Sequence, residues 1–488
     1  MKKIFLILIG LIAFTACDDV IDIEQPGILT SDKAVQSVDD FESTLLGVYA
    51  RLDNTTEILF NAGFTDEMAL GLVNGGQNIL LLGQQLTPAS GFSAGLWSSY
   101  YITINQINKL LLAGEALTVD PADQAEYNEI RGEFLAIRAY CHFQLLTYFS
   151  TDLTDDSALG VVKLDIIPGP TQFLPRNTNG EVYEFINQDL DEAATLISTQ
   201  SERQFISRDF VTALRARMAA YRGQYTLADQ YATTLLNSYT LTNQIRYFNT
   251  FDDSDDSGII FELERTINDN FDNQATGGGG WAGSLFAFGG STIDGSPFME
   301  LSRSLYNSID DADIRKTRLV DPTSRIDPNY ATAADPKESD VLVIRLYPGH
   351  ESQPLMNDIK IFRVSEMLLI KAEAQIALGN LPAAATLLKQ LQDNRYASPQ
   401  PLANFGSAQV AYAALLDERR KELALQGFRW VDIKRLGVRA NTTIDRDAID
   451  CAFNGVCTIS NTDHRFALPI PLGEIDLAGD ILQQNPGY

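Results

Sequence analysis

The sequence predicts a mainly α-helical protein in which pairs of helices form a curved scaffold and a loop-rich part carries short strands. Three observations support this expectation. Apolar residues recur at helical spacing through most of the chain, and two segments repeat a helix, a short turn and a second helix. Between residues 252 and 353, by contrast, Gly, Asp, Asn and Pro interrupt the apolar runs. We expect four helix pairs in the 488-residue chain, which is long enough to bury a large core.

The first residues have the composition of an export signal. Two lysines precede an apolar run over residues 4–14, which is too short to span a bilayer comfortably. The run ends in Phe-Thr-Ala directly before Cys17, an arrangement that resembles a lipobox. We therefore expect residues 1–16 to be a lipoprotein signal peptide, Cys17 to carry the lipid and residues 17–27 to form a tether. The alternative is an ordinary signal peptide followed by a chance cysteine.

The first half of the chain then predicts helices of different character. Residues 41–52 and 97–117 carry apolar stripes and form the first pair, around an irregular insert at residues 61–95 that is rich in Gly, Asn and Gln. Residues 134–149 are apolar on nearly all sides, which predicts a helix buried on both faces. Residues 182–197 are amphipathic, so this helix is expected to cover the core with one face only.

Two helix hairpins show the clearest repeat. Residues 211–222 and 227–237 form one, and residues 365–378 and 382–395 form the other. Both have a glycine in the turn and alanines where the helices would touch, which allows close contact. This layout resembles a tetratricopeptide repeat, whose units stack into a curved scaffold and present loops on one side.

The loop-rich part and the stretch after the second hairpin complete the pattern. Short strands are expected at residues 258–263 and 341–346. Residues 417–437 predict a charged helix that ends at Gly427 and a second short helix after it. Opposite charges can pair along the first of these helices, Asp417 with Lys421 and Arg419 with Glu422.

This last stretch, ERRKELALQGFRWVDIKRLG, resembles the signature ERRxELxxEGxRWxDLxRxG of the SusD/RagB family. That family comprises surface lipoproteins with which Bacteroidetes capture nutrients for TonB-dependent transporters. Three further segments resemble the family in the same order, at residues 131–150, at residues 362–380 and in the C-terminal LPIPLGEIDLAGDILQQNPGY. Gln426 stands where the family usually has Glu, which keeps a hydrogen-bond acceptor but loses the charge.

The resemblance implies a division of the chain and a location. Residues 28–250 correspond to a SusD-like N-terminal region with tetratricopeptide-like helices and the insert loop 61–95. Residues 251–488 correspond to the C-terminal region, with a loop-rich part at 251–360, helices at 361–436 and a tail. The implied location is the extracellular side of the outer membrane, with the lipid as anchor. The implied partner is a SusC-like TonB-dependent transporter, on which we expect the stacked helices to dock because the loops hold ligand.

The charge and the cysteines narrow the partners further. A formal net charge of −27 repels nucleic acid and anionic headgroups, so we expect no nucleic-acid partner and favour a neutral glycan over an anionic one. Cys451 and Cys457 lie in a loop with Gly and Asn and can close a small disulfide in an oxidising compartment. Neither a histidine nor a second CxxC accompanies them, which argues against a metal site there. Cys141 lies within an apolar helix and is expected to be buried.

Catalysis has little support in the sequence. The three histidines, His142, His350 and His464, lie in separate segments, so their spacing indicates neither a zinc triad nor a Ser–His–Asp set. Carboxylates are so numerous that no glycosidase pair stands out. We therefore expect a protein that is not an enzyme and needs no cofactor.

Ligand capture fits the composition better. Sugars have flat C–H faces and hydroxyl groups, so their sites combine aromatic rings with amide or carboxylate groups at the edge. Residues 273–298, with a glycine run at 277–280, and residues 65–97 have this composition, and the resemblance implies that loops at these two places form the glycan site. The predicted glycan-binding residues are Trp281, Phe286, Phe288, Asp294, Asp66, Asn74, Gln77, Asn78 and Trp97.

The two predicted tryptophans each have a structural alternative. Trp281 could anchor its loop in the core, and Trp97 could belong to the scaffold because it lies at the start of a helix. Phe286 and Phe288 alternate as in a strand, so we expect both rings to face one side.

One acidic segment matches the spacing of a calcium loop. Asp253, Asp255, Ser257 and Glu264 occupy the first, third, fifth and twelfth positions of such a loop. The flanking residues predict a strand where an EF-hand requires a helix, so we expect an acidic surface turn without a metal.

The sequence thus predicts a surface glycan-binding lipoprotein that captures an oligosaccharide and delivers it to a TonB-dependent outer-membrane transporter. One alternative is capture of a peptide, as in the RagB branch, where backbone hydrogen bonds would replace ring stacking. The other is a surface glycoside hydrolase.

Overall fold

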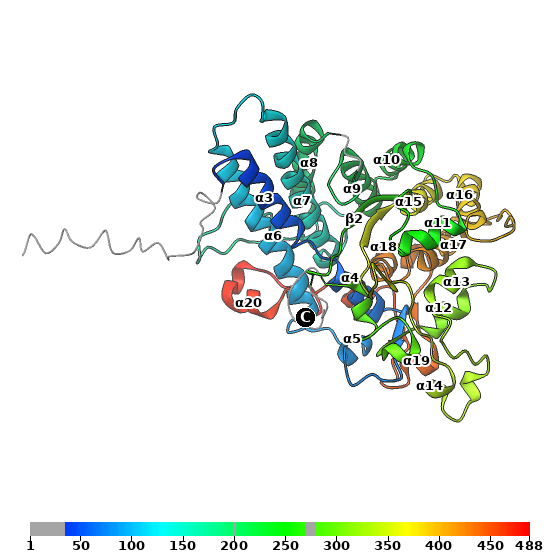
Figure 1. The fold of residues 1–488 in the computed structure, drawn as a ribbon. Coiled ribbons are helices and arrows are strands. Elements are labelled where there is room, and N and C mark those ends of the chain that lie inside the picture. Colours follow the sequence, from blue (N-terminus) through cyan, green and yellow to red (C-terminus); the bar gives the residue numbers. More distant parts are fainter. Residues whose placement is uncertain (1–34, 199–201, 270–279) are drawn as a thin grey trace, which may run out of the picture.

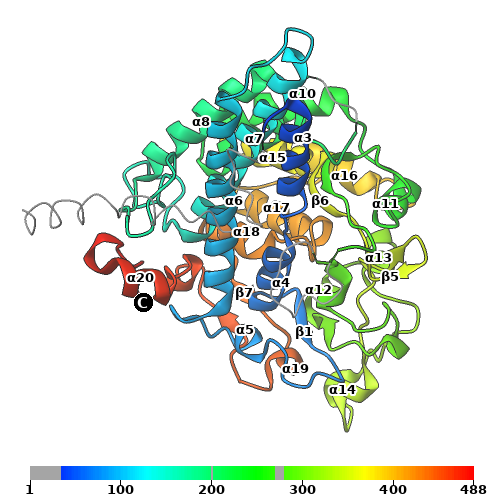
Figure 2. The ribbon, with the colours of Figure 1, turned by 60° about the vertical axis from the view of Figure 1, so that its left-hand side comes forward.

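Helices make up most of the chain and follow one another in the order that the sequence predicts (Figure 1). The computed structural model describes residues 35–198, 202–269 and 280–488. The predicted signal peptide, the lipid-bearing Cys17 and the tether to residue 27 lie outside the described residues. In Figures 1 and 2 the hairpin helices α9, α10 and α15 lie in the upper part of the molecule, and α12 and α14 of the loop-rich segment lie at the lower right.

The first pair is α3 (Val38–Tyr49) and α6 (Gly91–Glu115), which lie side by side. Phe41 fills the space beside Gly114, where a Cβ would lie 2.7 Å from the phenyl ring. The insert between them is less irregular than predicted, because it contains the helices α4 (Thr55–Phe64) and α5 (Ile79–Leu82) and the strand β1 (Met68–Leu70). Nearly all of α4 is buried, which explains why its residues form a regular helix.

The second pair is α7 (Gln124–Phe149) and α8 (Asn179–Leu196). Every residue of α7 from Phe134 to Phe149 is buried except Arg138, as the apolar pattern predicts. A capping box formed by Thr178 and Glu181 fixes the start of α8.

The two predicted hairpins are present and stack on each other. They are α9 (Arg208–Tyr221) with α10 (Tyr225–Ser238) and α15 (Val364–Ala377) with α16 (Leu381–Asp393). The turn glycines Gly223 and Gly379 have φ angles of 75° and 83°, which a side chain would disfavour. Although the hairpins are far apart in sequence, α10 packs directly against α15 (Figure 1). The predicted fold class is confirmed.

The charged helix α17 (Ala408–Glu422) ends five residues earlier than predicted, and α18 (Arg429–Ala440) follows it. Arg363 donates to the carbonyl oxygen of Glu422 at 2.7 Å, which satisfies this group without a further helical turn. The predicted pairing of Arg419 with Glu422 is wrong, because Arg419 bonds Asp432 instead, at 2.7 Å.

The remaining predicted features of this stretch agree with the structure in part. The pairing of Asp417 with Lys421 is confirmed, at 2.6 Å. Gly427 has the expected positive φ, 86°, but it lies in the turn before α18 and does not cap α17.

The part of the chain that the structure describes contains four antiparallel two-stranded sheets, and two of them tie distant segments together. The expected strand β2 (Ile259–Leu263) pairs with β6 (Ile359–Arg363), and β1 pairs with β3 (Met299–Leu301). Residues 341–346 form isolated bridges rather than the predicted strand, because Val343 pairs with Glu300 whereas Val341 and Ile344 pair with the segment at residues 320–325. The other strands are β4 (Gly349–His350), β5 (Gln353–Pro354), β7 (Ile444–Asp445) and β8 (Thr458–Ile459). The other helices are α11 (Gln244–Phe251), α12 (Arg303–Ser308), α13 (Ile314–Leu319), α14 (Pro336–Ser339), α19 (Ala448–Cys451) and α20 (Leu472–Ala478).

Among residues 35–198, 202–269 and 280–488, no helix has both the length and the apolarity that crossing a bilayer requires.

Candidate functional site

A groove lies where the insert between α3 and α6 meets the loop-rich segment, and its volume is about 340 Å³. Its walls come from α4, the residues before α5, the first turn of α6 and the segment that leads into β3. The lining residues are Thr55, Thr56, Leu59, Gln77, Asn78, Gly91, Phe92, Gly95, Leu285 and Phe298.

Backbone pairing holds the two sides of the groove together. Beyond the β1–β3 ladder, the amide of Gly71 donates to the carbonyl oxygen of Phe298 at 2.9 Å. The Nδ2 of Asn74 donates to the same oxygen, also at 2.9 Å. A Cβ at position 71 would lie 2.5 Å from the carbonyl carbon of Phe298, so only glycine permits this approach. The insert and the loop are therefore fixed to each other at the groove.

The polar groups of the groove are uncharged. Among residues 35–198, 202–269 and 280–488, those that line the groove include a hydroxyl from Thr56 and two amides from Gln77 and Asn78, and no carboxylate, ammonium, guanidinium or imidazole group. Gln77 itself accepts a hydrogen bond from the amide of Gly75, at 2.7 Å. Hydroxyls and amides both donate and accept hydrogen bonds, so they suit a neutral ligand that carries hydroxyl groups.

The first turn of α6 provides an open surface beside an aromatic ring. Gly91 and Gly95 are one helical turn apart, and a Cβ built at either position meets no atom within 4 Å. Phe92 between them is half-buried, with its ring 6.2 Å from that of Phe60. This turn therefore offers a ligand both exposed backbone and part of a phenyl ring.

The prediction that Trp281 and Phe286 form an exposed platform is wrong. Trp281 is 6% exposed, and its indole N–H donates to the carbonyl oxygen of Thr266 at 3.1 Å. Phe286 is 2% exposed and stacks on Tyr347 with ring centroids 6.3 Å apart. Packing inside removes more of the apolar ring surface from water than an exposed loop position would, which favours the buried arrangement. The two rings therefore anchor the loop.

Asp66 is also a structural residue. It is 1% exposed, and its carboxylate bonds the guanidinium of Arg429 at 2.8 Å and lies 3.5 Å from Arg420. Burial would raise the pKa of Asp66, but the two arginines outweigh this effect and hold the pKa well below its usual range. The predicted role of Asp66 in ligand binding is therefore wrong, because its oxygens are already bonded inside the protein.

The other predicted residues lie in different places. Phe288 is 44% exposed and packs against Phe298 of the groove at 4.5 Å, so the two neighbouring rings Phe286 and Phe288 do not share one side. Asp294 is exposed on the same loop. Trp97 is buried on a different face of α6, next to a second pocket rather than the groove.

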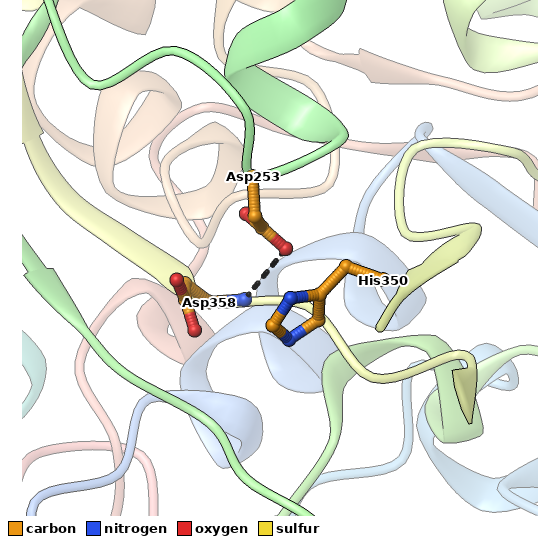
Figure 3. Close-up of side chains that lie close together, drawn as sticks. All are labelled: Asp253, His350 and Asp358. Atoms are coloured by element: carbon orange, nitrogen blue, oxygen red, sulfur yellow. Dashed lines mark hydrogen bonds between the residues drawn. The ribbon is translucent and has the colours of Figure 1, made fainter. Parts of the chain in front are cut away.

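The four calcium-loop candidates do not converge on one point. Asp255 accepts a hydrogen bond from the amide of Ser257 at 2.9 Å, and Glu264 is exposed beyond the end of β2. Asp253 instead faces His350 and Asp358, as Figure 3 shows. The ligand atoms of these three residues lie within 4.8 Å of one another.

A lysine already supplies the positive charge at this cluster. The ammonium group of Lys360 is buried, contacts the carboxylate of Asp253 and lies 3.5 Å from Glu262. Burial would lower the pKa of Lys360, but Glu262, Asp253 and Asp358 outweigh it and raise the pKa. The acidic groups therefore hold a permanent cation from the chain itself.

The histidines remain apart. His142 is buried beside α8, where its ring N accepts the backbone N–H of Leu164 at 3.2 Å, and burial lowers its pKa to about 4. His464 packs its ring against Tyr488 at 5.0 Å. Neither lies beside the groove, so the described structure gives the groove no histidine base.

Cys451 and Cys457 are bonded to each other, with Cα atoms 5.2 Å apart. Cys141 is buried as a free thiol within α7. The disulfide closes the loop that follows α19.

Several groove residues were not foreseen, namely Thr55, Thr56, Leu59, Gly91, Phe92, Gly95, Leu285 and Phe298. The sequence contained one usable signal. Two glycines four residues apart flank Phe92 in the segment GFSAG, and such spacing at the start of a helix leaves one face of it bare. Phe298 has no such signal, because only the pairing of β1 with β3 brings it to the groove.

Two family models match the chain in separate regions. Residues 29–248 match the model described as "Starch-binding associating with outer membrane", and residues 350–488 match the model described as "SusD family". A curated relative, SusD-like protein P38 of Formosa agariphila, is 23% identical over 481 residues, which cover 90% of this chain and 91% of the relative.

Solved structures share the fold. A SusD superfamily protein from Bacteroides thetaiotaomicron superposes with a TM-score of 0.77 at 24% identity, covering 92% of this chain and all of that one. Surface glycan-binding protein A from the same species, solved in complex with laminarihexaose, gives a TM-score of 0.69 at 17% identity, covering 92% of this chain and 99% of that one.

Proposed function

Because the chain belongs to the SusD/RagB family, we propose that it is a surface glycan-binding protein that captures an oligosaccharide in the groove between its two loops and delivers it to a TonB-dependent outer-membrane transporter. The observation that carries the proposal is the uncharged groove, with Thr56, Gln77 and Asn78 beside the ring of Phe92. The family description names starch binding and the outer membrane, so it supports both the capture of a glycan and its delivery at the outer membrane.

The chemistry of the groove favours a neutral sugar over other ligands. An anionic glycan would need a cation among the lining residues, and those that the structure describes include none. A glycoside hydrolase would need two carboxylates beside the bound sugar, and the lining residues contain neither Asp nor Glu. We therefore propose binding without catalysis.

The cellular arrangement extends this proposal. Cys17 carries the lipid after removal of residues 1–16, and residues 17–27 tether the protein to the extracellular side of the outer membrane. Residues 28–250 and 251–488 form the two family regions, whose loops meet at the groove. Phe288, Asp294 and Asn74 remain candidates at its edge.

The test fills the groove with a side chain. Gly95→Leu should abolish retention on a neutral polysaccharide in an affinity gel, because the new side chain would occupy the groove. Gly47→Leu on α3 is the matched control, since Gly47 is also an exposed helical glycine whose Cβ would meet nothing within 4 Å. Both substitutions should leave the fold intact, because leucine is a better helix former than glycine.

The panel should include starch and laminarin, together with peptides recovered from the purified protein. Retention that Gly95→Leu removes and Gly47→Leu preserves supports sugar capture. No retention on any polysaccharide, combined with peptides that copurify with the protein, would replace sugar capture with peptide capture of the RagB type. Shorter products after incubation with the polysaccharides would show that the protein is an enzyme.

A further inference from the structure

A second pocket lies on a different face of α6, with a volume of about 430 Å³. Its floor is apolar: Trp97 and Tyr101 come from α6, Val162 and Leu174 from the segment between α7 and α8, and Leu482 from the C-terminal segment. Nδ2 of Asn108 donates to the carbonyl oxygens of Leu164 and Ile166, both at 3.0 Å. These bonds fix the segment between α7 and α8 to α6. Figures 1 and 2 both show α20 beside the same end of α6.

Exposed large apolar side chains line this pocket at Ile102 and Phe173 and recur on the segments that form it. They come from all three segments that form it, and Leu477 is 71% exposed. We call these seven residues the α20 patch: Ile102, Ile166, Ile167, Phe173, Leu472, Leu477 and Ile481. Soluble surfaces carry single exposed leucines, but seven exposed apolar side chains on the three segments that form one pocket are typical of a protein interface, whose central anchor side chains fill such pockets.

The charge at the patch restricts what covers it. Residues 472–482 carry Glu474, Asp476 and Asp480 and no basic residue. Lys163 on the neighbouring segment pairs with Asp165 at 2.9 Å. An acidic rim repels anionic headgroups, and it repels a second copy of this acidic chain. It attracts a protein surface in which lysine or arginine surrounds an apolar side chain.

The position of the α20 patch beside the groove indicates which kind of partner would bind there. The groove and the pocket share α6: Gly95 lines the first and Ser98 the second, about 4.5 Å apart along the helix axis. The amide of Leu472 also donates to the carbonyl oxygen of Pro88 at 2.8 Å, just before the groove-lining turn of α6. A protein seated on the patch would therefore lie next to the bound glycan.

We propose that the α20 patch is the surface on which the protein docks on its outer-membrane transporter, which inserts an apolar side chain into the pocket and surrounds it with basic residues. This inference rests on the proposed delivery to a transporter. It also narrows the expected docking face from the stacked helices in general to one end of α6 with α20. Ligand transfer then needs no long path, because the docked barrel and the groove are neighbours.

The experiment compares apolar-to-charged changes on and off the patch. Leu477→Asp and Phe173→Asp, each in the full-length lipidated protein, should reduce copurification of the TonB-dependent barrel from solubilised outer membranes at least tenfold, with the barrel identified by peptide mass spectrometry. Ile245→Asp is the matched control, because Ile245 is 73% exposed on α11, which Figure 1 places far from α20. All three variants should keep the melting temperature and the polysaccharide retention of the parent protein.

A photo-crosslinking residue at position 477 provides a second readout that does not depend on loss of binding. It should crosslink to the barrel, whereas the same residue at position 245 should not. Copurification that Leu477→Asp and Phe173→Asp leave unchanged would overturn the inference. The inference would also be overturned if the two variants still retained the barrel but lost binding to phosphatidylglycerol vesicles. That result would show that the patch binds lipid. If no barrel copurifies with the parent protein, both this inference and the delivery half of the proposed function fail, while polysaccharide retention still tests capture independently.

Discussion

Arg395 and Glu422 form a fully buried ion pair through two hydrogen bonds, from Nε to Oε2 and from Nη2 to Oε1, each 2.9 Å long. Arg363 and Arg315 contact the same carboxylate at 3.0 and 3.4 Å. Burial would raise the pKa of Glu422, but Arg395 and Arg363 outweigh it and hold the pKa well below its usual range. One carboxylate thus joins α17 to β6, α13 and the end of α16.

Glu422→Gln should therefore destabilise the fold strongly. The substitution removes the charge that compensates three buried arginines, and breaking a buried pair in this way costs about 3–5 kcal/mol. Urea unfolding followed by circular dichroism should show this loss in the free energy of unfolding. Lys389→Gln is the control: its pair with Asp393 is an exposed i,i+4 contact at 2.6 Å, and removing it should cost about 0.5 kcal/mol or less. Equal effects of the two changes would contradict the central role of Glu422.

Glu57 makes stability depend on pH in a defined direction. Burial raises its pKa to about 8 from a usual value of 4.5, although the hydroxyl of Tyr100 donates to it and partly opposes this shift. Between these values the folded state binds a proton that the unfolded chain has lost. The contribution of Glu57 is therefore complete below about pH 4.5 and is lost as the pH rises towards 8.

Glu57→Gln removes this dependence, because the amide does not titrate. From roughly pH 5 to 7.5, the free energy of unfolding of the variant should gain on that of the parent by up to about 1.4 kcal/mol per pH unit. Glu126→Gln, at an exposed position, should leave the pH dependence of the parent unchanged. A variant whose stability runs parallel to that of the parent would show that Glu57 is ionised when folded.

Asn74→Ala should weaken glycan binding with little effect on global stability. Its Nδ2 donates to the carbonyl oxygens of Phe298 and Gln77, at 2.9 and 3.2 Å, and so positions both sides of the groove. Losing these bonds should reduce affinity about three- to tenfold, measured by titration calorimetry with the retained sugar. Asn461→Ala is the matched control, because its Nδ2 also bonds two backbone carbonyls, at 3.0 and 3.1 Å, and Asn461 does not line the groove. Unchanged affinity in Asn74→Ala would mean that the groove holds its shape without this link.

The disulfide between Cys451 and Cys457 should contribute modestly to stability. It closes a short loop, for which the loss of chain entropy in the unfolded state is worth about 2 kcal/mol. Replacing both cysteines by serine should lower the free energy of unfolding by that amount and leave polysaccharide retention intact. Iodoacetamide should label these two positions only after reduction, and labelling of the untreated protein would show that the bond is absent.

The sequence predicted the helical scaffold well because its signals are local. A glycine in each turn and alanines at the contacts define the hairpins α9–α10 and α15–α16 wherever they finally lie. The expectation that Gln426 keeps a useful acceptor is also confirmed, since its Oε1 accepts a hydrogen bond from Arg363 at 3.1 Å.

The site was predicted less completely because exposure is not a local property. Composition marked Trp281 and Phe286 as possible sugar platforms, yet neighbouring segments cover both rings. Phe92 was not singled out within the predicted insert, although it lies in the first turn of α6, where the bare surface of Gly91 and Gly95 exposes it to the groove. Charge pairing failed for the same reason, because Arg419 found Asp432 in the next helix rather than Glu422 on its own.

The amino-acid order alone thus determined which segments become helices and which helices form hairpins. These depend on interactions between residues that are close along the chain. Only the tertiary structure decided which side chains remain open to solvent, which arginines meet Glu422, and that α20 lies against α6 beside the groove. Those outcomes depend on contacts between segments hundreds of residues apart, where burial and charge compensation select one arrangement among many that the local pattern permits.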